Sequence, residues 1–464
     1  MPVYNISTKG GKIIFMKLTV IGAGVSGQGL ALLAHQLGNE VFVSEQKTIA
    51  PEVKEIFAQN HIDYEEGHSE KVFTGTDGIL ISSGIPPQSK ILQEAQSRGV
   101  KMTGELDFVL PHIRSEKLVC VTGSNGKSTV TSLIGHILTR AGLKAGTGGN
   151  LGTASAKFTQ EDFDAVVLEL SSFQLARAEH NLGADVAIIT NLAPDHLDWH
   201  GSYEAYVEAK SRVLSLRSSD GWGIIQDRDA ETLNPSGKII TLSWSRNPEH
   251  EFSGHIFMSE SEALLTLDGR TESIFRYSDT TLIGSHNLEN VAMSLCAVRL
   301  LGVSGDVKTL LEGFRPLPHR CEDAGTLDGV KYIDDSKGTN VAASITAMKS
   351  IPGRKIIILG GQGKGEDYAP LAEAVKEECE YAMLIGEEAG KIHDALKHSG
   401  FGEERIYFVP DMEGAVNTAQ KLARPGMVVL LSPACTSWDM YKSYKARGEH
   451  FCRIVREKIS AQWK

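Results

Sequence analysis

The sequence predicts an α/β protein of three domains, Rossmann-like at each end and P-loop ATPase-like in the middle, with a small antiparallel extension on the middle domain. Three observations predict this class. The 464 residues suffice for two to four domains with separate cores. Short apolar runs alternate with helical patterns, and glycine-rich turns directly follow several of those runs. We place the domains at residues 1–114, 115–316 and 317–464.

Composition narrows the possible partners. The net charge of -11 argues against nucleic acid or an anionic membrane surface as the main partner. Six scattered cysteines without a C-x-x-C pair indicate reduced thiols rather than disulfides or a zinc site. No apolar run reaches membrane-spanning length, and residues 1–16 lack the apolar core of a signal peptide, so we expect a short extra arm there. These features predict a cytoplasmic protein without membrane insertion.

The first domain begins with a glycine turn typical of pyrophosphate binding. The expected strand Lys17–Ile21 leads into Gly22–Gly27, which reads G-x-G-x-x-G, and Glu45 follows the next strand. NAD or FAD fits this pattern, but the same backbone turn can hold the pyrophosphate of a nucleotide sugar. A second glycine turn, Ser82–Pro87, follows the strand Gly78–Ile81 and either faces the same crevice or is a plain Pro-Gly loop.

The middle domain opens with a phosphate-binding pattern. A β-rich run ending at Thr122 passes into Gly123-Ser124-Asn125-Gly126-Lys127-Ser128-Thr129 and then into a helical pattern. Backbone N–H groups freed by the two glycines can converge on phosphate oxygens, Lys127 adds a positive charge, and the Ser128 hydroxyl can bind Mg²⁺. Position 121 is Val where the common P-loop has its first glycine. The simpler alternative is a Gly-Ser turn before a helix.

Two further strand ends carry candidate metal ligands. Glu169 ends the apolar run Ala165–Leu168, where P-loop proteins place a Mg²⁺-directed acid, although a helix-capping role is the alternative. His196 lies between two aspartates after the strand Val186–Thr190, which suits a metal or phosphate site. Lys210 lies on an expected helix and is by default a solvated residue.

The rest of the middle domain is less specific. Residues 221–284 are rich in short β-like runs, which predict the antiparallel extension. Asn287 and Asn290 lie one helical turn apart, so both amides can point the same way, but such pairs also serve as caps. Two prolines within residues 314–320 fit a domain junction.

The last third repeats the α/β rhythm. Five strands are expected, at Val330–Ile333, Lys355–Leu359, Tyr381–Ile385, Arg405–Val409 and Met427–Leu431. Polar, glycine-bearing turns follow three of them, at residues 334–340, 360–365 and 432–438. Ligands of open α/β sheets sit at such strand ends, so we expect a third domain that closes over the nucleotide site.

With these motifs assembled, the chain resembles the Mur ligases, the ATP-dependent amide-forming enzymes of peptidoglycan precursor synthesis. The resemblance covers essentially the whole length and is closest to the D-glutamate-adding members. The supporting stretches are residues 123–129, 168–175, 334–340 and 431–437. The Asn-Pro-Arg type signature usual in members that add a diamino acid is absent from the sequence.

The resemblance implies three substrates. The first domain would bind the UDP part of UDP-MurNAc-L-Ala, the middle one ATP, and the last one D-glutamate. An acyl phosphate would form on the alanine carboxylate, and the amine of D-glutamate would displace phosphate from it. The resemblance also implies a monomer with two Mg²⁺ ions and a carbamylated Lys210.

The same resemblance assigns residues to these roles. Catalysis would involve Lys127, Glu169, His196 and Lys210, and the metal ligands would be Ser128, Glu169, His196 and Lys210. The nucleotide would contact residues 123–129 together with Asn287, Asn290, Arg320 and Asp335. The other substrates would contact Ser26, Glu45, Ser83, Asn150, Lys337, Thr339, Lys364, Ser437 and Tyr444.

Three alternatives remain open at this point. A dinucleotide-dependent oxidoreductase would explain the first glycine turn, but not the phosphate-binding pattern, Glu169 or His196. A nucleotide-gated binding protein would hydrolyse ATP without joining anything. Another Mur-type or folylpolyglutamate-type ligase would differ only in its amino acid.

Overall fold

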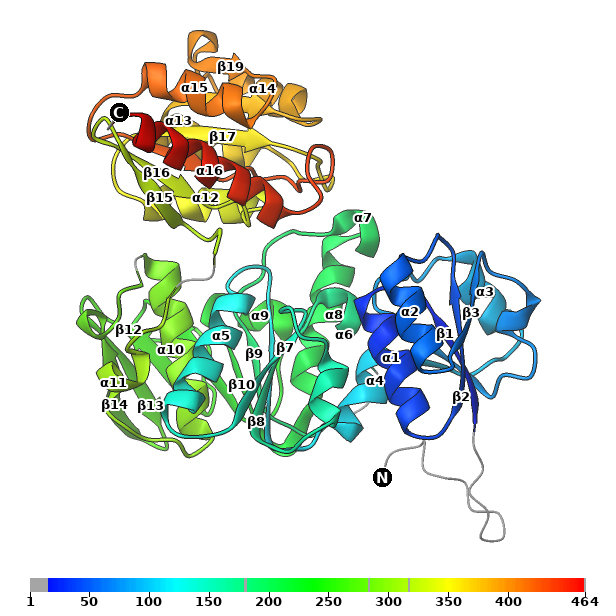
Figure 1. The fold of residues 1–464 in the computed structure, drawn as a ribbon. Helices are drawn as coiled ribbons and strands as arrows, with labels where there is room; N and C mark the ends of the chain where they lie inside the picture. Colours follow the sequence, from blue (N-terminus) through cyan, green and yellow to red (C-terminus); the bar gives the residue numbers. More distant parts are fainter. Residues whose placement is uncertain (1–15, 179–181, 283, 316–317, 463–464) are drawn as a thin grey trace. The chain divides into compact units, whose positions relative to one another are not determined.

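The described chain forms two compact units. The computed structural model describes residues 16–178, 182–282, 284–315 and 318–462. The first unit comprises the chain up to Leu192 with Val207–Thr280 and Asn290–Glu312, and the second comprises Ala193–Tyr206, Thr281–Glu289 and the chain from Gly313 onward. Two sheets lie in the first unit and one in the second (Figure 1). The predicted α/β class with three sheet-based domains is confirmed, while the exact boundaries stay predictions.

The first sheet is fully parallel, with strand order β3-β2-β1-β4-β5. Its strands are β1 (Lys17–Ile21), β2 (Glu40–Glu45), β3 (Asp63–Glu66), β4 (Gly78–Ile81) and β5 (Met102–Gly104), and its helices are α1 (Val25–Gln36), α2 (Pro51–Gln59), α3 (Lys90–Ser97) and α4 (Glu105–Val109). Since β1 pairs with both β2 and β4, the chain order reverses at β1. Such a reversal opens a crevice at the carboxyl ends of the strands, where both glycine turns lie.

The second sheet has nine strands, in the order β14-β13-β12-β11-β10-β9-β6-β8-β7. Its strands are β6 (Ser115–Thr122), β7 (Ala145–Gly149), β8 (Phe163–Glu169), β9 (Ala184–Ile189), β10 (Arg217–Gln226), β11 (Ile239–Ser243), β12 (Gly254–Met258), β13 (Glu262–Leu267) and β14 (Arg270–Arg276). Helices α5 (Lys127–Arg140), α6 (Ser172–Leu175), α9 (Ala230–Leu233) and α11 (Val307–Leu311) belong to the same unit as this sheet. Helix α7 (Leu197–His200) belongs to the second unit, and α8 (Tyr203–Ser215) and α10 (Ser285–Leu300) begin in the second unit and continue in the first.

The expected antiparallel extension is shorter than the sequence predicted. Strands β10, β11 and β12 continue the sheet in parallel, and antiparallel pairing is confined to β12 with β13 and β13 with β14. Short β-like runs suggest hairpins, but the helical turns between β10 and β11 provide a crossover, which parallel neighbours require.

The third sheet has the order β15-β16-β20-β17-β18-β19. Its strands are β15 (Glu322–Leu327), β16 (Val330–Asp334), β17 (Lys355–Gly360), β18 (Cys379–Ile385), β19 (Ile406–Phe408) and β20 (Val428–Leu431), and its helices are α12 (Val341–Ser350), α13 (Ala369–Glu378), α14 (Ala389–His398), α15 (Met412–Leu422) and α16 (Tyr444–Gln462). The five predicted strands are present, and β15, which pairs antiparallel with β16, was not predicted. Buried apolar clusters cover both faces of this sheet.

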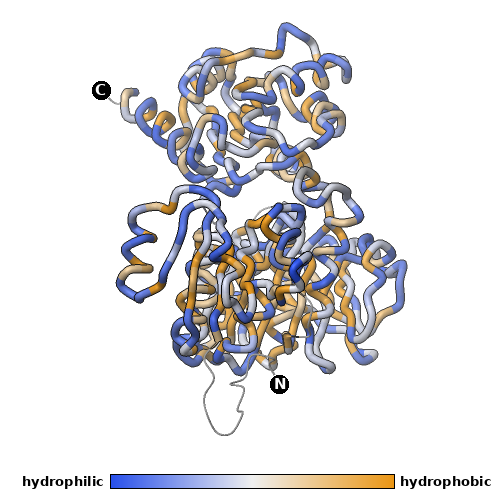
Figure 2. The backbone as a smooth tube through the Cα atoms, turned by 90° about the vertical axis from the view of Figure 1, so that its right-hand side faces the viewer, coloured by the Kyte–Doolittle hydropathy of each residue, from blue (hydrophilic) through white to orange (hydrophobic). Residues whose placement is uncertain are grey.

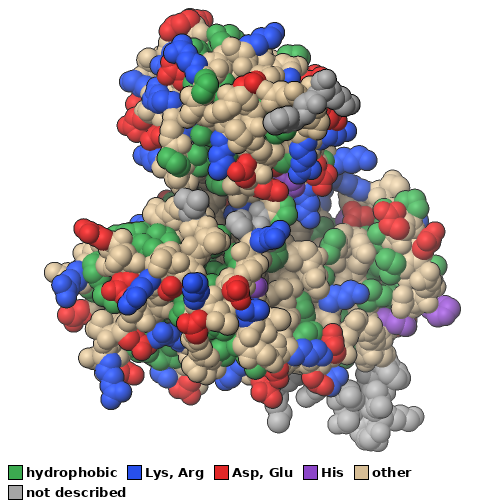
Figure 3. Space-filling view, turned by 60° about the vertical axis from the view of Figure 1, so that its left-hand side comes forward, with side chains coloured by type: hydrophobic (Ala, Val, Ile, Leu, Met, Phe, Trp, Pro, Cys, Tyr) green, Lys and Arg blue, Asp and Glu red, His purple; other side chains and the backbone are tan. Residues whose placement is uncertain are grey.

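Burial follows the apolar runs that predicted the strands. Figure 2 shows many hydrophobic stretches of the backbone in the interior and many hydrophilic stretches at the periphery. On the face drawn in Figure 3, acidic and basic side chains are interspersed rather than gathered by sign. Among the described residues, no helix has the length and apolar character that crossing a bilayer requires.

Candidate active site

The phosphate-binding pattern adopts the strand–turn–helix geometry that the sequence predicted. The turn of residues 123–126 joins β6 to α5, and Gly126 caps the helix with φ +82°. Both glycines are required sterically. A Cβ on Gly123 would lie 2.0 Å from the Thr190 hydroxyl oxygen, and one on Gly126 would lie 2.5 Å from Asn290 Oδ1. The Lys127 ammonium donates to the carbonyls of Gly123 and Ser124, each at 2.8 Å, which holds its charge over the turn.

Asn191 supports this turn and was missed by the sequence reasoning. Its carbonyl accepts from the Ser124 N–H at 2.9 Å, and its Oδ1 accepts from the Asn125 N–H at 3.0 Å. These two N–H groups therefore brace the turn against the end of β9. The first turn of α5, whose N–H groups lack intrahelical acceptors, is then the part of the backbone suited to bind phosphate. Its position directly after a buried strand was the only signal in the sequence.

Oxygen donors suited to Mg²⁺ surround the start of α5. Ser128 lies buried in the first helical turn, and Glu169 lies at the end of β8 with 2% of its surface exposed. The Asn150 amide donates to Glu169 Oε1 at 3.0 Å, so this predicted substrate residue also orients the carboxylate. Hydroxyl and carboxylate oxygens are the ligands that Mg²⁺ prefers, and the residues present therefore fit the ion.

The helix-capping alternative for Glu169 and the default interpretation of Lys210 are both wrong. Ser171, and not Glu169, caps α6, in a capping box with Gln174. Lys210 is 2% exposed rather than solvated, and its ammonium donates to the Gly123 carbonyl at 2.7 Å. The face of α8 that carries Lys210 packs into the interior, and a single polar residue in the sequence cannot reveal this.

We expect Gly123→Ala to destabilise the protein by more than about 2 kcal/mol and to abolish nucleotide binding, since the methyl group collides with Thr190 at a φ of +141°. Thermal unfolding and ATP-binding calorimetry measure both effects. The matched control is Gly142→Ala after α5, where φ is also positive but the methyl group enters open space among the described residues. It should cost about 1 kcal/mol and leave ATP affinity unchanged, and equal effects of the two variants would contradict the steric argument.

The second unit brings three predicted residues together around a buried ion pair. Lys364 donates to Asp195 Oδ1 at 2.8 Å and lies 3.5 Å from the Thr339 hydroxyl. The Asn340 amide donates to the other Asp195 oxygen at 3.2 Å. His196 follows in the left-handed conformation, with its Nε2 3.7 Å from Asp195 Oδ1. The sequence placed Asp195 beside His196 but did not predict that it pairs with Lys364.

Glu366 adds a titrating carboxyl beside this pair. It accepts the Val341 N–H at the start of α12 at 3.0 Å. Burial raises the pKa of Glu366 to about 7, with a further raising contribution from Asp195, while Val341 and Lys364 oppose the shift. The folded carboxyl therefore holds a proton at pH values where the unfolded one has lost it.

This shift predicts a pH-dependent effect of Glu366→Gln. Because the folded pKa lies above the ordinary 4.5, the stabilising contribution is complete below pH 4.5 and is lost as pH rises through 7. As the pH rises from 4.5 to 8, the free energy of unfolding of the variant should rise by roughly 1–2 kcal/mol relative to that of the parent, a value discounted for partial exposure of the carboxyl. Unfolding midpoints across that range measure it, with the exposed Glu373→Gln as control. A difference independent of pH would contradict the prediction.

A second group of predicted residues surrounds the start of the loop after β16. Asp335 accepts from the Ser432 hydroxyl at 2.7 Å, and burial raises its pKa to about 7 against that bond and the Arg320 charge. Burial, and secondarily Arg320, lower the pKa of His286 to about 4. His286 is therefore neutral at pH 7, and it lies beside the predicted Asn287, in the first turn of α10.

The remaining predicted residues of this unit lie on two connected loops and at the start of α16. The Lys337 ammonium sits 5.3 Å from the Tyr444 ring centroid, and Ser437 is buried. Arg447, which the sequence reasoning missed, is buried and joins the two loops. Its guanidinium donates to the carbonyls of Ser336, Cys435 and Thr436 and to the Ser336 hydroxyl.

The predicted UDP contacts lie around the two glycine turns of the first sheet. Glu45 accepts the Ala23 N–H at 2.7 Å, and the Ser26 hydroxyl donates to Glu105 at 2.5 Å. The Ser83 N–H approaches the Ser26 oxygen at 3.5 Å. The second turn therefore lies beside the first, and its role in substrate binding stays a prediction.

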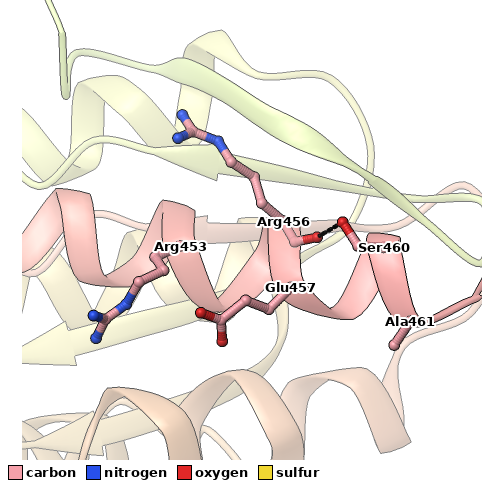
Figure 4. Close-up of a pocket in the computed structure, with 5 residues that line it drawn as sticks. All are labelled: Arg453, Arg456, Glu457, Ser460 and Ala461. Atoms are coloured by element: carbon pink, nitrogen blue, oxygen red, sulfur yellow. Dashed lines mark hydrogen bonds between the residues drawn. The ribbon is translucent and has the colours of Figure 1, made fainter.

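A separate depression of about 360 Å³ lies along α16 (Figure 4). Its lining consists of Arg453, Arg456, Glu457, Ser460 and Ala461. All five are exposed and come from one helix, and the Ser460 hydroxyl donates to the Arg456 carbonyl of that same helix. Depth and converging polar groups from several elements are missing, so this depression is not a candidate active site.

Comparisons with known proteins agree with this geometry. Residues 121–298 match the family model of the Mur ligase middle domain, residues 319–435 that of the Mur ligase, glutamate ligase domain, and residues 17–91 that of the MurD N-terminal domain. The chain therefore belongs to the Mur ligase family.

Full-length relatives refine this class. The UDP-N-acetylmuramoylalanine–D-glutamate ligase of Bacteroides thetaiotaomicron is 33% identical, with 95% of this chain and 99% of the relative covered. The enzyme of the same name from Natranaerobius thermophilus is 36% identical, with 95% and 97% covered. The predicted resemblance to the D-glutamate-adding members is confirmed.

Solved structures share the fold. A pseudomurein peptide ligase type C from Methanothermus fervidus aligns with a TM-score of 0.59 at 18% identity, covering 96% of this chain and all of that one. A folylpolyglutamate synthase from Mycobacterium tuberculosis aligns at 0.55 and 15% identity, covering 75% and 93%. At such identities the likeness concerns the fold alone.

Proposed function

We propose that this chain joins D-glutamate to UDP-N-acetylmuramoyl-L-alanine, with conversion of ATP to ADP and phosphate. The observation that carries the proposal is the full-length identity of 33–36% to ligases named for this reaction. The strand–turn–helix phosphate site at residues 123–129 supports it independently.

The first half of the reaction activates the alanine carboxylate. A carboxylate oxygen attacks the γ-phosphorus of ATP, and the bond from that phosphorus to the β,γ-bridging oxygen breaks. ADP departs, and the alanine carboxylate has become an acyl phosphate. Two anions must approach each other, so positive charge is required. Lys127 supplies it from the first residue of α5, and Ser128 with Glu169 would hold a Mg²⁺ ion. When bound, that ion neutralises charge on the phosphate oxygens.

The second half joins the amino acid. The neutral amine of D-glutamate attacks the acyl carbon, and phosphate departs with the bonding electrons as the nitrogen loses a proton. A dicarboxylate substrate needs donors at both ends. Thr339, Lys364, Ser437 and Tyr444 are the proposed contacts, and Lys337 lies against Tyr444. Arg320, Asp335, Asn287 and Asn290 are proposed to hold the nucleotide.

Several finer points belong to the same proposal. His196 and a carbamylated Lys210 would hold or support a second Mg²⁺ ion. Burial of Lys210 favours the neutral amine that reacts with CO₂, which supports the modification. Ser26, Glu45, Ser83 and Asn150 are the proposed contacts of the UDP-linked substrate. We also propose that the protein is a monomer and that it acts in the cytoplasm, the compartment of its soluble substrates.

Phosphate release from ATP and Mg²⁺ tests the proposal directly. Release should require both UDP-N-acetylmuramoyl-L-alanine and D-glutamate, and mass spectrometry should find the glutamyl product. A panel of L-glutamate, L-lysine, diaminopimelate and folate substrates separates the nearest ligase alternatives. ATP turnover without an amine acceptor would favour the hydrolase alternative, and oxidation of reduced nicotinamide would favour an oxidoreductase.

A further inference from the structure

One short segment of the middle region is anchored in both glycine turns of the first sheet. This segment, residues 174–177, begins in α6, which packs against α4. The Gln174 amide donates to Glu105 at 3.2 Å, and the other Glu105 oxygen accepts the Ser26 hydroxyl of the first turn. The Arg177 guanidinium donates to three carbonyls of the second turn, those of Ser82, Ser83 and Ile85.

Arg177 is held in place by close packing. Gly104, at the end of β5, leaves room for Arg177 because it has no side chain. A Cβ on Gly104 would lie 3.0 Å from the Arg177 Cβ and 3.1 Å from the Arg177 carbonyl oxygen. Burial lowers the pKa of Arg177 to about 10, so the side chain is still a cation at neutral pH. A fixed positive charge therefore lies directly behind the second glycine turn.

These hydrogen bonds determine which way the peptides of the turn point. In a trans peptide the C=O and the following N–H point in opposite directions. Carbonyls of Ser82 and Ser83 directed at Arg177 therefore turn the N–H groups of Ser83 and Gly84 away from it. The Ser83 N–H approaches Ser26 of the first turn. A Cβ on Gly84 or on Gly24 would meet no described atom within 4 Å, so both turns border open space.

We propose that Arg177 is a positioning residue for the pyrophosphate of the UDP-linked substrate. It draws the carbonyls of the second turn away from the crevice, which leaves N–H groups to face the phosphate oxygens. Its charge adds attraction from behind the turn. This inference rests on the proposed function, since it takes the crevice of the first sheet to be the UDP site.

Binding of UDP-N-acetylmuramoyl-L-alanine without ATP tests the inference, measured by calorimetry on the full chain. Arg177→Met should raise the Kd, and the KM for this substrate, tenfold to a hundredfold, the range expected for hydrogen bonds to charged groups. The KM for ATP should change less than twofold. Arg177→Lys keeps the charge but not the planar fork, so it should recover part of the affinity.

UDP and uridine serve as further probes. The loss in Arg177→Met should appear with UDP and be absent with uridine, because only UDP carries the pyrophosphate. An equal loss for both ligands would overturn the inference, as would an unchanged Kd. If the parent protein binds neither UDP nor the UDP-linked substrate, the proposed function itself fails. Parent binding thus tests the function, and the variants test the role of Arg177.

Arg212 provides the matched control for general loosening of the segment. Its guanidinium donates to the Ala176 carbonyl at 2.7 Å, so it anchors the same segment from α8, and its described hydrogen bonds involve neither glycine turn. Arg212→Met should leave the Kd for UDP within twofold of the parent. A loss matching that of Arg177→Met would mean that anchoring alone matters, and would overturn the positioning role.

Discussion

Lys127→Ala should lower kcat/KM for ATP about a hundredfold to a thousandfold, the scale seen when a preorganised electrostatic donor is removed. The Lys127 ammonium is fixed by two carbonyls of the turn, so its charge needs no reorganisation as ADP departs. Alanine is a good helix former at the start of α5, and the unfolding midpoint should change little. Steady-state phosphate release and thermal unfolding give the two measurements.

Lys117→Ala is the matched control in the same strand–helix unit. Lys117 lies near the start of β6 and forms an exposed ion pair with Asp185 at 3.3 Å. Exposed pairs contribute roughly 0–1 kcal/mol, so neither stability nor turnover should change appreciably. Turnover of Lys127→Ala within tenfold of the parent would contradict the assignment of this turn as the site of phosphoryl transfer.

The second large effect is expected from Lys364→Met. The substitution removes the cationic partner from the buried Asp195 carboxylate, at a cost of about 3–5 kcal/mol in stability. It should also raise the KM for D-glutamate more than tenfold, because Lys364 is the proposed donor to a carboxylate of that substrate. Denaturant unfolding and initial rates at varied D-glutamate measure the two effects.

A double variant separates pairing from substrate binding. Asp195→Asn combined with Lys364→Met leaves no unpaired charge, so most of the stability should return while the KM for D-glutamate stays high. Recovery of both properties would mean that Lys364 has a structural role only.

The control for this pair is Lys355→Met. Lys355 is also buried, and it pairs with Glu378 at 2.6 Å, near the amino end of β17 and away from the strand-end loops. The variant should lose stability and keep the parent KM for D-glutamate. A raised KM would indicate that any destabilisation of this sheet impairs substrate binding.

Some features of the site could be predicted from residues that are neighbours in the chain. The glycine turns after β1, β4 and β6 were predictable, because glycines, a preceding apolar strand and a following helix are neighbours in the chain. The position of Glu169 at a strand end was predictable for the same reason. The chemical roles of the site residues, as distinct from their positions at strand ends, came from the family resemblance. Most of the individual contacts with substrates stay predictions.

By itself, the sequence determined the α/β class, most strands and the phosphate-binding turn, since these depend on periodicity and backbone freedom within short stretches. Only the tertiary structure decided that β10–β12 run parallel, that Lys210 is buried, that Asn191 braces the turn and that Lys364 pairs with Asp195. Each of these depends on which distant segments meet, and a buried polar group takes its partner from the element packed against it.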